Sequence, residues 1–412
     1  MGITNLNPFL KERCPKTFNK ISLVDLAFTR VGIDGNNWAY VNRAIAQKKV
    51  INLTDVSMED PDSMAIDKQW FNSLLNFICV WLNYCITPCF IFDGIPLKEK
   101  DDTREKRNEA RLKAEHDVNA LKDELASLDL LEKPTDKIIE LRKLMCRSIK
   151  VEKGEIEMMK IVLRSIGIPF ITALHDGEQL GSFLCMEGKI SAFYSTDTDC
   201  LAYGCPLILN RFDRMTYKDE EGKKVHYCEV SMIQPALKGL SMNQTQFIDL
   251  CIMSGCDFNK NIHGTGIGKS YPLLMRYGNI ETIREKEGKD ISCLNVEKCR
   301  NIFRQKPSIQ CIQEGSKLEL DIFNPFRDIE RSIDTRDTLD TLGLGNFLSR
   351  LRDFYSVLEK KRKPIEEDQR INLVRLGLVE DPNIVKLKII SPSTQSRPIL
   401  KLVTPDTGLT SN

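Results

Sequence analysis

The spacing of apolar and polar positions changes several times along this chain of 412 residues. Up to about residue 97, short apolar runs alternate with longer amphipathic stretches, which is typical of an α/β protein. The pattern predicts a strand over 30–34, a helix from about Asn37, a second helix over 70–84 and a buried strand over 89–92. It resumes at about residue 166, so we expect both halves to share one mostly parallel sheet flanked by helices.

The remaining stretches have a different character. Residues 98–165 are charged and helical, with a break at 133–135 that predicts an inserted helical pair. After residue 240 the pattern is mostly helical, and residues 344–363 predict an amphipathic helix with basic residues near its end. The last stretch has two β-like runs and is expected to be a small extension or a partly ordered tail. The predicted parts are 1–97, 98–165, 166–240, 241–364 and 365–412.

Composition excludes several classes of protein. Hydrophobic residues make up 42% of the chain, and 59 Lys and Arg nearly balance 58 Asp and Glu, so any basic surface must be local. The 14 cysteines form no CxxC pair, and only 4 histidines accompany them, which argues against structural zinc and favours a reducing compartment. No uncharged run is long enough to span a bilayer, so we expect an intracellular protein without membrane attachment.

The candidate chemistry lies in acidic residues that stand where strands end or helices begin. Asp34 follows RVGI and Asp93 follows CFIF, while two pairs spaced two residues apart occur in HDGEQ and STDTD. Loops at the carboxyl ends of parallel strands converge on one crevice, and gathered carboxylates select hard ions such as Mg²⁺ or Mn²⁺. The sequence therefore predicts a two-metal site for phosphodiester cleavage. Its ligands would be Asp34, Asp93, Asp176, Glu178, Asp197, Asp199 and Asp257.

Each of these acids also has a simpler interpretation. Asp before Gly, as at Asp34, Asp93 and Asp176, is common in turns and at helix N-caps. Turn chemistry explains any single residue better than metal binding does. It does not explain why acids recur at strand ends in both halves of the sheet.

A basic stripe is predicted on the inserted helix. Lys100, Arg104, Arg107 and Arg111 recur at helical spacing, so they lie on one face that could pair with successive phosphates. A solvated helix with ion pairs between neighbouring turns fits the segment equally well. Proximity to a phosphodiesterase site would favour the nucleic-acid interpretation.

The glycine-rich sequence HGTGIGKS at 263–270 nearly matches a phosphate-binding P-loop. His263 stands where the first glycine is required, and no strand precedes the turn, so a nucleotide-binding role is disfavoured. Two alternatives are open. The backbone N–H groups of Gly264, Gly266 and Gly268 and the ammonium of Lys269 could contact a DNA phosphate, or the glycines could only allow tight helix packing.

Taken in order, these motifs resemble the XPG-type structure-specific 5′ nucleases, and among them the flap endonucleases. The resemblance runs from MGITNL to about residue 360 and includes VGIDGNNWAY, FIFDGIP, KEKDDTREKRNEAR, STDTDCLAYG, FIDLCIMSGCDF and HGTGIGKS. It implies a PIN-like fold with a helical arch over the site, and a helix-two-turn-helix region that grips duplex DNA. It also implies that the seven acids hold two Mg²⁺ ions, for which Mn²⁺ could substitute.

Further roles follow from the same resemblance. Lys100 and Arg107 match a basic pair that draws the scissile phosphate to the metals, and Tyr40 matches an aromatic that stacks on a nucleotide beside the cut. The glycine hairpin matches an element that often carries K⁺. The implied function is hydrolysis of flap or related branched DNA in replication, repair or recombination, by a monomer in the nucleus, or in the cytoplasm if the protein is viral.

The chain also departs from the family. Asp176 stands where the family has Glu, the stretch after Arg111 is longer than usual, and the tail has no sliding-clamp motif of the QxxLxxFF type. Clamp binding is therefore not expected, and a divergent, viral branch fits these differences. The resemblance leaves two other functions open: a 5′ exonuclease or junction or gap nuclease, and a DNA-binding scaffold without turnover.

Overall fold

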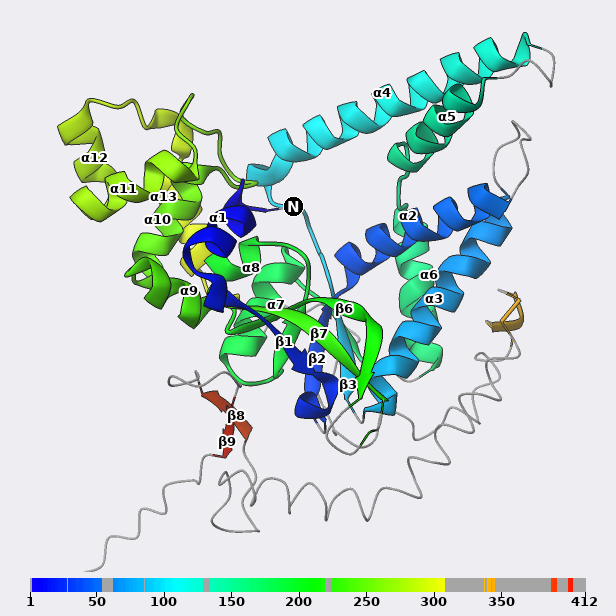
Figure 1. Cartoon of the computed structure of the whole chain (residues 1–412), viewed down its shortest axis with the longest axis horizontal. Coiled ribbons are helices and arrows are strands. Elements are labelled where there is room, and N and C mark those ends of the chain that lie inside the picture. The colour runs from blue at the N-terminus through cyan, green and yellow to red at the C-terminus, as the bar shows by residue number, and fades with distance from the viewer. Residues whose placement is uncertain are drawn as a thin grey trace, which may run out of the picture.

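The computed structural model describes residues 2–307 apart from 28, 54–61, 85, 129–133, 167, 219–221 and 223, together with 337, 339–341, 343–344, 387–390 and 399–402. At its centre is a seven-stranded sheet in the order β1-β7-β6-β5-β2-β3-β4 (Figure 1). In chain order these strands are β1 Phe18–Ser22, β2 Arg30–Asp34, β3 Thr87–Phe92, β4 Phe170–Thr172, β5 Ala192–Tyr194, β6 Leu207–Lys218 and β7 Lys224–Met232.

The sheet is parallel except at one side. β2 pairs in parallel with β3 and β5, while β4 continues the parallel sheet beyond β3 and β6 continues it beyond β5. β7 is antiparallel to β6, and β1 is antiparallel to β7. The expected mostly parallel sheet, shared by both halves of the core, is confirmed. The chain moves outward from β2 to β4 and then returns to β5, so β2 is the point where the strand order reverses.

Helices cover both faces of the sheet, because the two faces carry different apolar side chains. Cys89 and Ile91 of β3 pack with α1, α7 and the helices after residue 232, whereas Phe90 and Phe92 pack with α2, α3 and α6. This alternation is the two-residue period of a strand buried on both sides. The helices before the insertion and around the second half of the sheet are α1 Leu6–Arg13, α2 Gly35–Leu53, α3 Ser63–Asn83, α6 Lys153–Ser165, α7 Gly177–Met186, α8 Asp199–Ala202 and α9 Ile233–Leu240.

The inserted segment begins with the helical pair that the charge pattern predicts. α4 spans Asp101–Ala126 and runs away from the sheet, and α5 spans Thr135–Arg147 and returns beside it (Figure 1). They share a small apolar cluster that includes Leu125 and Leu141 and is separate from the two large clusters on the sheet. A third helix of this stretch, α6, instead buries Met159, Val162 and Leu163 against the sheet.

The stretch from residue 241 to residue 304 is mostly helical, as the sequence predicts. It contains α10 Gln244–Ser254, α11 Ile267–Tyr277, α12 Ile280–Glu287 and α13 Val296–Arg304. The two β-like runs of the tail form β8 Leu387–Ile390 and β9 Ile399–Leu402, which pair antiparallel. Apart from Leu344, the amphipathic helix predicted over 344–363 lies outside the described residues. Among the described helices, none has the length and apolar character needed to cross a membrane.

Candidate functional site

Six of the seven predicted acids follow the carboxyl ends of four adjacent parallel strands. Asp34 ends β2, Asp93 follows β3, Asp176 and Glu178 follow β4, and Asp197 and Asp199 follow β5. The seventh residue, Asp257, follows α10. Because these strands are neighbours and point the same way, their ends meet at one edge of the sheet.

Several of these carboxylates accept hydrogen bonds from the turns that hold them. Asp34 accepts from the backbone N–H of Asn37 at 2.9 Å and from the hydroxyl of Ser195 at 2.8 Å. Asp93 accepts from the N–H of Gly177 at 2.8 Å, and Asp176 caps α7 through the N–H of Glu178 at 3.0 Å. Turn and capping chemistry is therefore present, and it fixes these carboxylates at the strand ends.

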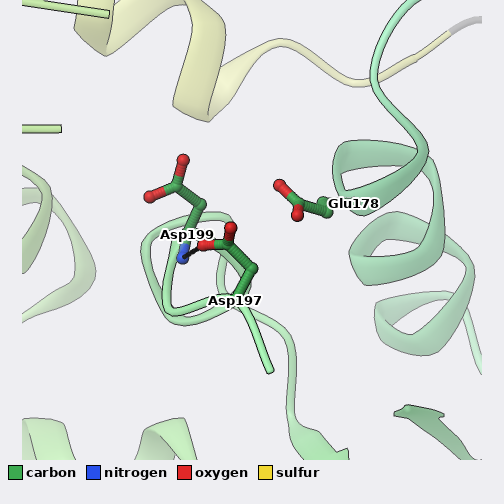
Figure 2. Close-up of side chains that lie close together, drawn as sticks. All are labelled: Glu178, Asp197 and Asp199. Carbon is green, nitrogen blue, oxygen red and sulfur yellow. Dashed lines mark hydrogen bonds between the residues drawn. The ribbon is translucent and has the colours of Figure 1, made fainter. Parts of the chain in front are cut away.

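Three of the acids form a tight cluster. One carboxylate oxygen from each of Glu178, Asp197 and Asp199 lies within 4.8 Å of the others, and Figure 2 shows the three side chains converging from α7 and the turn after β5. Asp197 accepts the backbone N–H of Asp199 at 3.0 Å. Both side-chain oxygens of Asp199 are buried and have no hydrogen-bond partner. A buried carboxylate without donors fits a cation ligand, so the cluster is compatible with a divalent metal.

The protonation of the acids reflects this crowding. Burial, followed by the charge of Asp93, raises the pKa of Asp34 to about 8. Burial and then the charge of Asp197 raise the pKa values of Glu178 and Asp199 well above the usual range. Loss of solvation and then the charge of Asp176 raise the pKa of Asp93 to about 6. The second cause of each shift is repulsion between neighbouring carboxylates, which bound cations would relieve.

Two cations from the inserted segment reach the acids. Lys100 Nζ lies 2.6 Å from Asp176 Oδ2 and 3.9 Å from Glu178 Oε2. Burial alone would lower the pKa of Lys100, but these carboxylates outweigh it and raise that pKa well above its usual value. Arg107 Nη2 lies 2.7 Å from Asp257 Oδ2. The base of α4 is therefore held against the acidic edge by charge.

The other members of the basic stripe make local pairs instead. Arg104 contacts Asp101 at 3.3 Å, and Arg111 contacts Glu115 at 3.1 Å. Lys100 belongs to the 3₁₀ turn η3 Lys98–Lys100 that precedes α4, so the helical spacing extends over the three arginines alone. The segment thus shows both features that the sequence suggested. Lys100 and Arg107 reach the acids, whereas Arg104 and Arg111 form ion pairs between neighbouring helical turns.

The glycine turn joins α10 to α11 and leaves its backbone open. A methyl group added at Gly264, Gly266 or Gly268 would meet no atom within 4 Å, so helix packing does not require these glycines. Gly264 has a φ of 69°, which favours glycine for conformational reasons. Lys269 Nζ donates to the carbonyl of Gly264 at 2.8 Å from an exposed position.

Tyr40 lies on α2 and is 46% exposed. Its hydroxyl donates to the carbonyl of Val151 at 3.4 Å, and burial is the main cause that raises its pKa. The ring is thus held from one end and open to solvent over much of its surface.

Sequence analysis missed several groups that support the acids. Ser195 binds Asp34 and also accepts the N–H of Asp197 at 3.1 Å, and the Tyr203 hydroxyl donates to Asp176 at 3.2 Å. Asn36 accepts the N–H of Asp93 at 3.0 Å. Asn36 lies two residues after Asp34, and this proximity in the chain is the one signal that could have pointed to it. Ser195 and Tyr203 lie within the STDTDCLAYG motif, but their partners Asp34 and Asp176 are distant in the chain, so only the fold reveals these two contacts.

Fold and site together define an α/β protein with an acidic, metal-compatible centre at the carboxyl edge of a mostly parallel sheet. The XPG N-terminal domain model matches residues 1–114, and the XPG I-region model matches residues 167–257. The Flap endonuclease 1 of Candida tropicalis is 31% identical over 289 residues, covering 69% of this chain and 70% of that protein. The chain therefore belongs to the XPG-type 5′ nuclease family.

Other nucleases show a similar degree of sequence identity to this chain. The Flap endonuclease 1 of Cryptosporidium parvum is 32% identical over 295 residues, which cover 69% of this chain and 56% of that protein. A probable RAD2-like endonuclease of Invertebrate iridescent virus 6 is 28% identical over 340 residues, covering 74% and 79%. The chain matches between 44% and 66% of the length of the first curated relatives.

The fold resembles solved structures of the family. The flap endonuclease-1 of Methanococcus jannaschii aligns over 84% of this chain and 97% of its own, with a TM-score of 0.52 and 21% identity. At this identity the likeness concerns the fold, and it agrees with the predicted PIN-like architecture.

Proposed function

We propose that this protein is a structure-specific 5′ nuclease that hydrolyses one phosphodiester near the junction of flap or related branched DNA. The single observation that carries the proposal is the meeting of the acidic side chains at one sheet edge. One carboxylate oxygen from each of Glu178, Asp197 and Asp199 lies within 4.8 Å of the others, and the remaining acids of the sheet edge follow strands adjacent to theirs. Without a bound cation, repulsion between these carboxylates would lower the free energy of unfolding, so the arrangement favours a metal-binding role.

The seven acids would hold two Mg²⁺ ions, or Mn²⁺ in their place. When bound, such ions lower the pKa of an attacking water and stabilise the leaving oxygen. The remaining work belongs to the chain. Lys100 and Arg107 stand against the acids and can exchange a carboxylate partner for the scissile phosphate, because an ammonium or guanidinium binds either anion. Catalysis would then need no His or Ser nucleophile.

Binding of the DNA would be divided between two surfaces. The open backbone of Gly264, Gly266 and Gly268, with Lys269, would contact phosphates of the duplex and read no base. Tyr40 would stack on a base next to the cut, with Arg104 and Arg111 of α4 beside the 5′ single strand that threads beneath the arch. Specificity would therefore come from DNA shape.

Three finer assignments belong to the same proposal. K⁺ would bind at the glycine hairpin, the protein would act as a monomer, and it would not depend on a sliding clamp. Cleavage and duplex binding measured in sodium and in potassium salts at equal ionic strength test the first, and sedimentation of the protein with and without DNA tests the second.

The double substitution Asp197→Asn and Asp199→Asn tests the catalytic assignment. It removes two charges from the cluster while nearly preserving side-chain volume, so we expect folded protein that binds a labelled flap but does not cleave it with Mg²⁺ or Mn²⁺. Asp213→Asn is the matched control, because Asp213 lies on β6 outside the cluster and pairs with Lys20. This variant should cleave the flap as the wild type does. Metal-dependent cleavage by the double variant would refute the mechanism.

A panel of flap, nick, gap, four-way junction and blunt duplex substrates tests the substrate class. We expect the flap to be cleaved fastest, and cleavage to require a divalent ion. If a gap or junction is preferred, the protein is a related nuclease of another specificity. Binding without hydrolysis under any divalent ion would instead indicate a DNA-binding scaffold.

A further inference from the structure

Asp176 differs from the clustered acids in the way its oxygens are bound. Its Oδ1 atom accepts the backbone N–H of Glu178 at 3.0 Å, and its Oδ2 atom accepts both the Lys100 ammonium at 2.6 Å and the Tyr203 hydroxyl at 3.2 Å. The carboxylate of Asp199 has no donor among the described residues. Asp176 also stands outside the group of three oxygens within 4.8 Å of one another (Figure 2). Hydrogen bonds from the protein therefore orient Asp176, whereas Asp199 has none.

Tyr203 reaches Asp176 from a firmly held position. It directly follows α8, and its backbone N–H donates to the carbonyl of Asp199 at 2.9 Å. Tyr203 is 5% exposed, and its ring packs against Phe303 of α13 with the two ring centroids 5.1 Å apart. A phenylalanine would pack in the same way, and a buried hydroxyl costs free energy unless it is hydrogen-bonded. The contact with Asp176 is therefore what the hydroxyl adds.

The length of Asp176 makes this contact important. Asp176 is one methylene shorter than the glutamate that is usual in the family at this position. Its Oδ1 atom is occupied in capping α7, so Oδ2 is the oxygen left for contacts beyond the helix. Lys100 and Tyr203 both bind that oxygen. The orientation of the short carboxylate therefore depends on these two donors.

Lys100 is the donor that can leave. Its Nζ atom also lies 3.9 Å from Glu178 Oε2 and 5.1 Å from the ring centroid of Phe258. In the proposed function Lys100 exchanges Asp176 for the scissile phosphate, and its ammonium would also be repelled by a divalent cation bound at the acids. Tyr203 cannot follow it, because the ring is packed and the backbone is tied to Asp199. After the exchange, the Tyr203 hydroxyl is the donor that remains at Oδ2.

We propose that Tyr203 is a positioning residue, whose hydroxyl holds Asp176 in place once Lys100 has moved to the phosphate. Tyr203 and the short Asp176 together take the role of the longer glutamate. Tyr203 touches neither the DNA nor the ions and acts through Asp176. A carboxylate with a fixed orientation binds a cation more tightly, because less freedom is lost on binding. This inference rests on the proposed function and adds a residue that sets the affinity of the metal centre.

The test compares the full-length wild type with Tyr203→Phe, Asp176→Glu and the variant that combines both. Tyr203→Phe deletes one oxygen atom and keeps the ring against Phe303. We expect it to lower the Mn²⁺ affinity, measured by calorimetric titration without DNA, by about 10–100-fold, the usual cost of losing a hydrogen bond that orients a metal ligand. The kcat on a labelled flap should also fall, whereas KM for the flap should not change, because Tyr203 does not bind DNA.

Asp176→Glu separates a positioning role from a packing role. A glutamate extends its carboxylate by one methylene, so its position no longer depends on a hydroxyl placed for the shorter side chain. Tyr203→Phe should therefore have little effect when Asp176→Glu is also present. The combined variant should bind Mn²⁺ more tightly and cleave the flap faster than Tyr203→Phe alone. Such non-additivity is expected of residues in direct contact and not of a general packing defect.

Tyr217→Phe is the matched control. The Tyr217 hydroxyl donates to Asp213 Oδ2 at 2.8 Å, and the Lys20 ammonium binds the same oxygen at 2.6 Å. This site repeats the arrangement of a lysine and a tyrosine on one carboxylate oxygen, but it lies outside the acidic cluster. Removing its hydroxyl should leave the Mn²⁺ affinity and kcat unchanged.

The outcomes separate this proposal from the proposed function. Failure of the wild type to cleave any branched DNA with a divalent ion would refute the proposed function. Cleavage by the wild type, with an unchanged Mn²⁺ affinity and kcat in Tyr203→Phe, would overturn the role of Tyr203 alone. That role would also be overturned by equal losses from Tyr203→Phe with and without Asp176→Glu, or by loss of the fold of Tyr203→Phe in circular dichroism.

Discussion

The acidic edge and the basic helix α4 meet at the same place but are held in different ways. The carboxylates of Asp34, Asp93 and Asp176 accept backbone N–H groups from the turns around them, so the fold positions them even without a ligand. The two cations at the start of the insertion have no such support: Lys100 and Arg107 are placed by the acids that they face. The positions of the carboxylates are therefore fixed by the fold, whereas Lys100 and Arg107 can exchange a carboxylate for a phosphate of the DNA.

The largest effect expected from this difference concerns Lys100 and Arg104. Lys100 lies among the acids, so Lys100→Ala should lower kcat/KM on a flap by about 10²–10³-fold, the usual cost of losing a positioned charge at a reacting group. Arg104 is exposed and paired with Asp101, so Arg104→Ala should cost less than about fivefold. Steady-state kinetics at one ionic strength measure both, and equal losses would contradict the division between them.

A smaller effect is expected at the glycine turn, where stability and binding should change in opposite directions. Gly268 is the second residue of α11 and has open space around it, so Gly268→Ala should raise the melting temperature slightly through helix propensity. The added methyl group should hinder approach of a phosphate and weaken duplex binding by up to about tenfold, the value of one hydrogen bond. Fluorescence anisotropy without divalent metal measures the affinity.

Gly154→Ala provides a matched control for this prediction. Gly154 is also the second residue of a helix, α6, and also has no atom within 4 Å of an added methyl group. It should give the same gain in stability and no change in DNA binding. If both variants bind duplex DNA as the wild type does, the glycines of the turn have no part in DNA contact.

The smallest effect is a pH dependence of stability in the metal-free protein. Burial and the charge of Asp93 hold the pKa of Asp34 at about 8, far above its value in an unfolded chain, so the folded state retains a proton that the unfolded state loses. Stability should then fall as pH rises from about 4 to about 8. With EDTA we expect the melting temperature to fall by a few degrees between pH 6 and pH 8.

Added Mg²⁺ should reduce or abolish this fall, because the ion stabilises the ionised carboxylates and competes with protons for them. Thermal unfolding at both pH values, with EDTA and with Mg²⁺, measures the difference. A melting temperature in EDTA that rises with pH over this range would contradict the account of the acidic edge.

The same contrast explains how much could be predicted from the sequence. The strand over 30–34, the strand over 89–92 and the acids after them follow from local runs of apolar residues and from the turn residues that end them. The helical pair follows from the charge pattern of 98–165. These features depend on neighbours in the chain, which a sequence displays directly.

Other features depend on contacts between distant residues. Lys100 lies in a 3₁₀ turn and therefore does not belong to the helix that carries the three arginines of the basic stripe. The charged sequence of this turn is like that of the helix after it, so the boundary between them could not be predicted. Ser195 and Tyr203 reach Asp34 and Asp176 only because β5 lies beside β2 and α8 lies beside α7. Strand order and helix packing decide such contacts, and no periodicity in one segment encodes them.

The most direct test of the central claim is a calorimetric titration of the full chain with Mn²⁺. The account predicts two bound ions for each wild-type chain. It predicts loss of at least one of them in the Asp197→Asn and Asp199→Asn double variant, whose fold should remain intact by circular dichroism. Two ions bound by the double variant with unchanged affinity, or no ion bound by the wild type, would contradict the claim that these acids form a metal centre.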